Sequence, residues 1–236
     1  MTDDTRSALV ELLGTAEPEH EWPEARRTML AGYTGSTRNA VLDAIVPFLS
    51  KYEGVLTFMY LDTIGLVTCG LGNLVDPIKV ALSLPWKRFD GSLATMDEVT
   101  FAWHVVKDRQ DMRAGGGVAF GRLPGNEIRL DEHALAALVC TQLRTNEIIL
   151  KQRCPRFDEW PAPAQLGLHS MAWAAGPYLR FPTFFSCVNS DPPDFANAAI
   201  ASHMSNGAPA RNAANRALFE QAAAVVRDGG NYDEIA

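Results

Sequence analysis

Apolar residues recur at helical spacing through the second half of the chain. Residues 131–153 form a long amphipathic segment, with Asp131 placed as its N-cap. Residues 161–176 are apolar on almost every side, which is typical of a helix buried at the centre of a domain. Shorter helical patterns follow at 181–189, 193–204 and 215–230. The pattern predicts a predominantly helical lobe.

Residues 39–73 change from a helical to an extended pattern. Residues 39–54 repeat apolar side chains at helical spacing, contain Pro47 as a kink or restart, and end at Glu53 and Gly54. The following segment, "VLTFMYLDTIGLVTCGLGN", is rich in β-branched and aromatic residues and is interrupted by glycines. We expect short twisted strands joined by tight turns, with "GLG" serving as turn residues rather than as a dinucleotide loop.

The middle of the chain carries weaker signals. Residues 95–112 read as a helix that opens with a capping box, and "GGG" at 115–117 then breaks the chain. Residues 119–130 are expected to be a loop with an extended piece. "LPWKRF" at 84–89 is either a sugar- or partner-binding patch or a loop with a packed tryptophan.

Organisation into domains follows from these patterns. Residues 1–40 are rich in proline, glycine and charge, and predict an N-terminal extension or docking arm with two short helices. Residues 41–236 predict one α+β domain, with a small β element near its front followed by a helical lobe.

Composition and charge exclude several classes of function. A net charge of −7 disfavours nucleic-acid binding, and no apolar run approaches the about 20 residues that span a bilayer. The acidic N-terminus lacks the pattern of a signal peptide. Four separated cysteines without a C-x-x-C pair predict reduced core or half-buried thiols. Without an H-E-x-x-H motif we expect neither a metal nor a cofactor, and His169 is predicted to be a core residue.

Two carboxylates and one hydroxyl are the candidate catalytic groups. Glycosidic bond cleavage needs one carboxyl group held protonated and another ionised. Glu53 lies at the end of an apolar helix, which favours protonation, whereas Asp62 lies in the strand-and-turn segment, where backbone N–H groups favour ionisation. Thr68 could orient a water. By spacing alone, Glu53 and Asp62 could equally be a helix-end and a turn residue without catalytic function.

A resemblance to a known family favours the catalytic alternative. "YEG" followed by "YLDTIGLVTCGLGN" resembles the active-site segment of the phage-type lysozymes, or endolysin muramidases, whose catalytic Glu, Asp and Thr correspond to Glu53, Asp62 and Thr68. Downstream, "LGLHSMAWAAGPYLRFPTFFSCVN" and "NGAPARNAANRALFEQAAAVVRDG" are similar to the family's buried helix and C-terminal helix. The resemblance implies substrate-binding functions for Phe181 and Arg216. Where the family has an Asn or Gln that faces the sugar, this sequence has Ser170 or Ala174, and Ser170 is the candidate. Asn73 replaces the histidine that ends the family motif.

The resemblance implies a lysozyme-like α+β fold for residues 41–236, in which a cleft separates a small hairpin or three-stranded sheet lobe from a larger helical lobe, with an insertion at about 79–126. It also implies a peptidoglycan hydrolase that cleaves the MurNAc–GlcNAc bond with inversion. Glu53 would be the acid, Asp62 the base or charge stabiliser, and Thr68 would position the water. We expect a monomer that is made in the cytoplasm, acts at the cell wall, does not insert into membranes, and has an immunity or inhibitor protein and a delivery partner. Both a secretion-system effector and a phage endolysin fit this description. The alternative from another class is a non-catalytic lysozyme-like module that binds glycans or serves an injection machine structurally.

Overall fold

The structure is a computed structural model that describes residues 23–205 and 209–236. Residues 1–22 of the predicted N-terminal extension lie outside the described residues. The chain divides into two compact units, which we call the sheet unit (described residues 23–28 and 49–139) and the helical unit (29–48 and 140–236). The boundaries fall inside three helices: α2 (Pro23–Gly32), α3 (Asn39–Glu53) and α6 (Glu132–Arg153).

The sheet unit is built on a three-stranded antiparallel sheet in the order β1-β2-β3. Its strands are β1 (Leu56–Leu61), β2 (Val67–Gly70) and β3 (Asn73–Leu74). Positive φ angles at Gly65, Gly70 and Gly72 form the connecting turns, as predicted. Together with the helices, this sheet confirms the α+β class.

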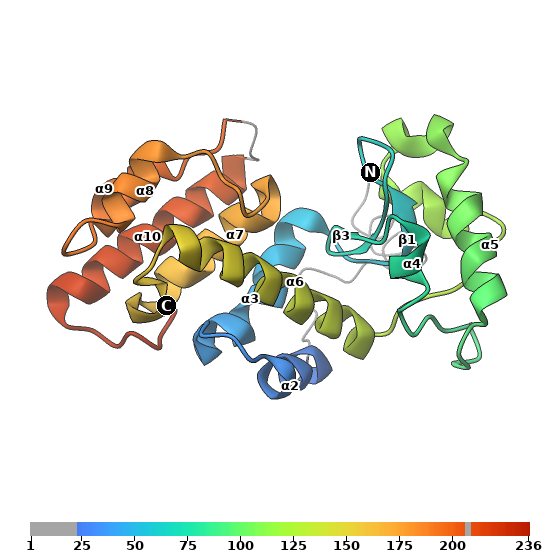
Figure 1. Ribbon diagram of the computed structural model, residues 1–236, viewed down its shortest axis with the longest axis horizontal. Helices are drawn as coiled ribbons and strands as arrows, with labels where there is room; N and C mark the ends of the chain where they lie inside the picture. The colour runs from blue at the N-terminus through green and yellow to red at the C-terminus, as the bar shows by residue number, and fades with distance from the viewer. Residues whose placement is uncertain (1–22, 206–208) are drawn as a thin grey trace, which may run out of the picture. The chain divides into compact units, whose positions relative to one another are not determined.

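The predicted insertion folds as part of the sheet unit (Figure 1). It contains α4 (Ile78–Ala81), α5 (Met96–Lys107) and the 3₁₀ helices η1 (Gln110–Gly115) and η2 (Gly117–Arg122). Thr95 and Glu98 form the predicted capping box, and Gly116, the middle residue of "GGG", separates η1 from η2.

The segment 119–130 was predicted as a loop, and this is wrong for its first residues, which belong to η2. The cause is close packing on β1: a Cβ on Gly117 would lie 2.7 Å from the Tyr60 ring, and one on Gly121 would lie 2.6 Å from the Phe58 ring. Glycine therefore lets this turn of helix lie directly against the strand. The predicted extended piece is present, because Arg129 forms a β-bridge with Lys87.

Two hydrogen bonds join the end of the insertion to β1. The fully buried Asn126 donates from Nδ2 to the carbonyl of Met59 (2.8 Å), and the N–H of Leu130 donates to the carbonyl of Thr57 (2.8 Å). The guanidinium of Arg129 lies 4.7 Å from the centre of the Phe58 ring. Asn126, at the end of the insertion, and Leu130, just after it, thus satisfy backbone acceptors of β1 that β2 does not reach.

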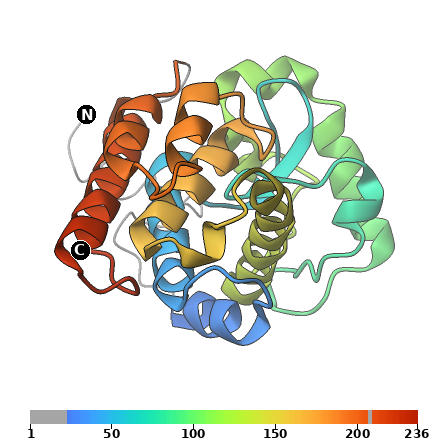
Figure 2. The same cartoon turned by 60° about the vertical axis from the view of Figure 1, so that its left-hand side comes forward.

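The helical unit packs around α7 (Ala162–Ala175), which is buried from Ala162 to Ala172 as its apolar sequence predicted. Its other elements are η3 (Phe157–Glu159), α8 (Pro182–Val188), α9 (Phe195–Ala201) and α10 (Pro209–Asp228). Helix α10 packs on both α7 and α9, and α8 packs on α9 (Figures 1 and 2). The Asp131 carboxylate caps α6 by accepting from the N–H of Ala134 (2.8 Å), as predicted.

A polar network holds the loop before α3 to α6 and α7. The carboxylate of Glu147 accepts hydrogen bonds from the Tyr33 hydroxyl and from the N–H and hydroxyl groups of Ser36 and Thr37. Burial would raise the pKa of Glu147, but these donors outweigh it and lower the pKa to about 2. The Thr37 hydroxyl also lies 2.8 Å from Nε2 of His169, which is fully buried.

Candidate functional site

Glu53 is the last residue of α3, as the sequence predicted. Gly54 follows with φ of 67°, which ends the helix, and β1 begins two residues later at Leu56. The Glu53 side chain is half-buried. The helix end therefore presents this carboxylate where the chain enters the sheet.

Asp62 organises the turn between β1 and β2. Its Oδ1 accepts hydrogen bonds from the N–H groups of Ile64 (3.0 Å) and Leu66 (2.8 Å), and its own N–H donates to the Leu66 carbonyl. Gly65, with φ of 85°, completes the turn. Both side-chain bonds use Oδ1, so the turn itself leaves Oδ2 for other contacts. Asp62 is therefore a turn residue and remains a candidate for chemistry.

Thr68 lies on β2 directly opposite Tyr60 on β1. Its side chain is buried, and its hydroxyl donates to the Leu66 carbonyl at 3.2 Å. Directly opposed residues of an antiparallel pair project on the same face of the sheet. Because the only hydroxyl proton of Thr68 is used by this carbonyl, its oxygen can act only as an acceptor toward a further group.

Tyr60 connects the predicted site residues. Burial raises the pKa of its hydroxyl, and electrostatic interactions with Cys69, Glu53 and Asp62 raise it further. Both candidate carboxylates therefore lie close enough to one phenol to act on it electrostatically. Sequence reasoning did not identify Tyr60 as a site residue, although it stands two positions before Asp62 in the Y-x-D part of the motif.

The insertion holds the Asp62 turn in place. Lys107, at the end of α5, donates from Nζ to the Gly65 carbonyl (3.0 Å) and to Oδ2 of Asp76 (2.6 Å). The same Asp76 oxygen accepts from the N–H of Val67 at 3.2 Å. Gln110 adds a second hydrogen bond to the Gly65 carbonyl (3.3 Å). No sequence pattern predicts this contact, because Asp76 and Lys107 are 31 positions apart.

Asn73 has a structural function at its position in the motif. It is buried, and its Oδ1 accepts from the N–H of Leu71 at 3.2 Å within the turn from β2 to β3. A Cβ on Gly70 would come within 2.9 Å of the same oxygen. The side chain therefore stabilises the turn on which β2 ends.

The three predicted substrate-binding residues lie in the helical unit. Ser170 is fully buried in α7, and its hydroxyl has no hydrogen-bond partner among the described residues. Phe181 lines a hollow of about 550 Å³ and Arg216 lines one of about 450 Å³; Ile200 and His203 contribute to both. Two of the three residues are thus near adjoining hollows, and the third is in the core.

The arginine that α10 buries is Arg211, whereas the predicted Arg216 is exposed and forms an ion pair with Glu220 at 2.8 Å. An exposed pair of this kind contributes little to stability. A buried guanidinium needs compensating partners. We therefore expect replacement of Arg211 to have the larger effect of the two. Arg211 stands in "PARN" at the start of α10, and the sequence motif did not identify it as a site residue.

The cysteines and His169 lie where the sequence predicted them. All four cysteines are free thiols, with Cys69 and Cys154 buried and Cys140 and Cys187 half-buried. His169 is a core residue. The described residues contain no group of three or more histidine, cysteine or acidic side chains placed to hold a metal ion.

Every helix in the part of the chain that the structure describes is too short or too polar to cross a bilayer. In comparisons with known proteins, no family model, no curated protein and no solved structure matches this chain.

Proposed function

We propose that the protein is a lysozyme-type muramidase that hydrolyses the MurNAc–GlcNAc bond of peptidoglycan. The observation that carries the proposal is that Glu53 ends α3 just before the sheet, Asp62 organises the β1–β2 turn and Thr68 is buried on β2, at the spacing of the phage-type lysozyme motif. A helix-end carboxylate and a hairpin-turn carboxylate supply the two groups that glycoside hydrolysis requires.

In the proposed reaction Glu53 donates its proton to the glycosidic oxygen as the bond to the departing sugar breaks. Asp62 accepts a proton from the attacking water through Oδ2, the oxygen that the turn leaves for other contacts. The same water donates its second proton toward Thr68, whose oxygen can only accept. With both protons so directed, the water's lone pairs are available to the anomeric carbon.

Attack by water on the face opposite the leaving group inverts the anomeric configuration. The proposal therefore implies about 6.5–9.5 Å between the two carboxyl groups, because a water must fit between Asp62 and the sugar. Proton NMR of the first products distinguishes the two outcomes. Hydrolysis of the β-linked glycan would release the α-anomer first, whereas release of the β-anomer would assign a retaining mechanism.

The test is hydrolysis of purified peptidoglycan by the full chain. The native protein should release new reducing ends on MurNAc, identified by borohydride reduction and mass spectrometry. Glu53→Gln should lower the rate by about 10²–10⁴-fold, because it removes the general acid. Glu159→Gln, at an exposed carboxylate in the helical unit, is the matched control.

Two outcomes would refute the proposal. If the Glu53→Gln variant keeps a rate within a few-fold of the native protein, Glu53 is not the acid. If the native protein releases no reducing ends but sediments with peptidoglycan, it is the non-catalytic glycan-binding module of the alternative hypothesis. Far-UV circular dichroism of each variant separates these results from misfolding.

A further inference from the structure

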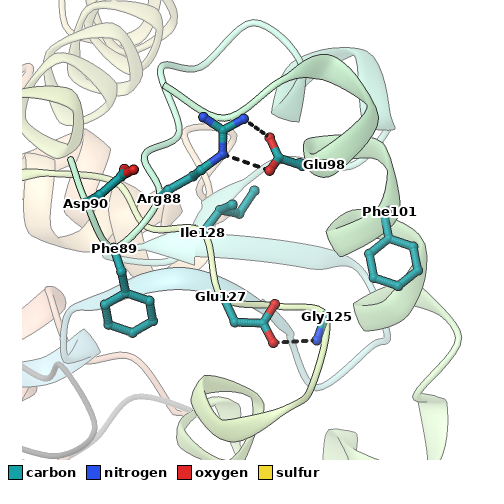
Figure 3. A pocket seen from close by; sticks show the side chains of 8 residues that line it. All are labelled: Arg88, Phe89, Asp90, Glu98, Phe101, Gly125, Glu127 and Ile128. Atoms are coloured by element: carbon teal, nitrogen blue, oxygen red, sulfur yellow. Dashed lines mark hydrogen bonds and ion pairs between the residues drawn. The ribbon is translucent and has the colours of Figure 1, made fainter. Parts of the chain in front are cut away.

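A hollow of about 410 Å³ lies on the surface of the sheet unit, within the region predicted as an insertion and the residues just after it (Figure 3). It is lined by the 88–90 segment, by Glu98 and Phe101 of α5, and by residues 125–128. Phe89 and Phe101 stand on opposite sides, with Ile128 between them in this view. Volumes of this size accept a single side chain or a small ligand.

The aromatic rim of the hollow is exposed and held in place. Phe89 is 85% exposed and Phe101 is 60% exposed. The turn that carries Phe89 is closed by hydrogen bonds from the N–H of Arg88 to the carbonyl of Ser92 (2.9 Å) and from Ser92 to the Asp90 carboxylate. Exposed apolar side chains that gather beside a hollow with a polar rim mark a contact surface, whereas single ones are common.

Two further apolar side chains of the same stretch of chain are exposed. Leu93 and Met96, which lie between Phe89 and Phe101 in the sequence, are 62% and 68% exposed. Four exposed apolar side chains within thirteen residues favour a peptide partner over a sugar, because a peptide can cover such a surface. Trp86 of the "LPWKRF" segment does not contribute to this exposed surface, because its ring is buried and its N–H donates to the Ala81 carbonyl.

The charged groups of the hollow are unbalanced. Arg88 is engaged by Glu98 through two hydrogen bonds of 2.8 Å and 2.6 Å, which neutralises both. Asp90 and Glu127 remain as two further carboxylates. Glu127 is oriented by the N–H of Gly125, which donates to its Oε1 at 2.8 Å. The hollow therefore presents two negative charges beside an apolar floor and disfavours an anionic occupant.

We propose that this hollow binds a lysine side chain from an apolar peptide segment of a partner protein. The four methylenes of lysine match the surface between Phe89 and Phe101, near Ile128, and the ammonium group reaches the Glu127 carboxylate, which lies between the two rings in Figure 3. The Asp90 carboxylate, which lies apart from Glu127 and accepts hydrogen bonds from Ser92, adds only longer-range attraction. Neighbouring apolar residues of the partner cover Leu93 and Met96. This proposal does not depend on the muramidase proposal, because none of its residues belongs to the candidate catalytic site.

The test uses the full chain with ¹³C-methyl-labelled isoleucine and two synthetic peptides, acetyl-Leu-Lys-Leu-amide and acetyl-Leu-Gln-Leu-amide. The Ile128 methyl signal, assigned with an Ile128→Val variant, should shift with both peptides. The lysine peptide should bind about threefold or more tightly, as expected for one partly exposed ion pair. Adding 0.5 M salt should remove most of this preference.

Two variants and one control locate the contact. Glu127→Gln should reduce the preference for the lysine peptide to near one, while Phe89→Ala should weaken both peptides. Asp111→Asn, an exposed carboxylate of η1 outside the hollow, should preserve the preference. The proposal is overturned if the two peptides bind native protein equally, if neither shifts Ile128 at 5 mM, or if chitotriose shifts Ile128 more strongly than the lysine peptide does.

Discussion

Lowering the pH from 7.5 to 5.0 should destabilise the helical unit through one buried histidine. His169 is fully buried, and this burial lowers its pKa from 6.5 to about 4, against the opposing charge of Glu147. The hydrogen bonds around His169 explain why its pKa is lowered. Thr37 donates its hydroxyl proton to Glu147, so Nε2 of His169 must donate to Thr37.

The remaining imidazole nitrogen, Nδ1, is buried without a hydrogen-bond partner among the described residues. Protonation at Nδ1 would therefore bury both a charge and an unsatisfied N–H group. Between pH 6.5 and pH 4 the unfolded chain binds a proton that the folded protein does not. Stability is thus complete above pH 6.5 and falls as the pH drops toward 4.

The size of the effect follows from the two pKa values. When the pH falls from 7.5 to 5.0, His169 should lower the unfolding free energy by about 2 kcal/mol, since one unit of pKa corresponds to about 1.4 kcal/mol. The assay is urea unfolding followed by far-UV circular dichroism at both pH values, for the native protein and for His169→Gln. Glutamine keeps an N–H donor for Thr37 but does not titrate, so other groups cancel in the comparison.

The reasoning is refuted by either of two results. One is a pH dependence of the His169→Gln variant equal to that of the native protein. The other is a histidine NMR titration in which the His169 ring, in the folded protein, titrates near pH 6.5. The same NMR experiment should find the neutral tautomer that carries its proton on Nε2.

Three further predictions concern the sheet unit. Lys107→Met removes the donor to the Gly65 carbonyl, so the amide of Leu66 in the Asp62 turn should exchange with solvent about fivefold faster, measured by hydrogen exchange. An unchanged exchange rate would exclude a positioning function for Lys107. Thr95→Ala removes the cap of α5 and should lower the unfolding free energy by about 1 kcal/mol in urea, whereas Thr95→Ser should restore it. Asn126→Ala leaves the carbonyls of Met59 and Phe120 without their donor and should cost about 2 kcal/mol or more, and a loss below 0.5 kcal/mol would contradict its assignment.

Local patterns were sufficient to predict the elements that local chemistry controls. The end of α3 at Glu53, the glycine turns of the sheet, the capping box at Thr95 and the cap at Asp131 all depend on residues within a few positions of one another. The buried α7 was predictable because its sequence is apolar on every side. These features need no knowledge of distant parts of the chain.

The unpredicted features all join distant residues. Helix η2 could not be foreseen, because it depends on Gly117 and Gly121 meeting the rings of Tyr60 and Phe58. The network around Glu147 joins residues 110 or more positions away, and a sequence contains no signal for such pairing. The candidate site divides in the same way. The motif supplied Glu53, Asp62 and Thr68, whereas Tyr60 was recognised only from the charges around it.

The hydrogen bonds from the insertion to β1 also protect the protein from self-association. In the order β1-β2-β3, strand β1 is an edge strand, and one side of it would expose unpaired backbone carbonyls. Asn126 and Leu130 occupy the carbonyls of Met59 and Thr57, two positions apart on that edge. Removing residues 79–126 to obtain a minimal domain would take away Asn126 and leave the Met59 carbonyl of that edge open to strand addition from another molecule, and we expect such a truncated protein to aggregate.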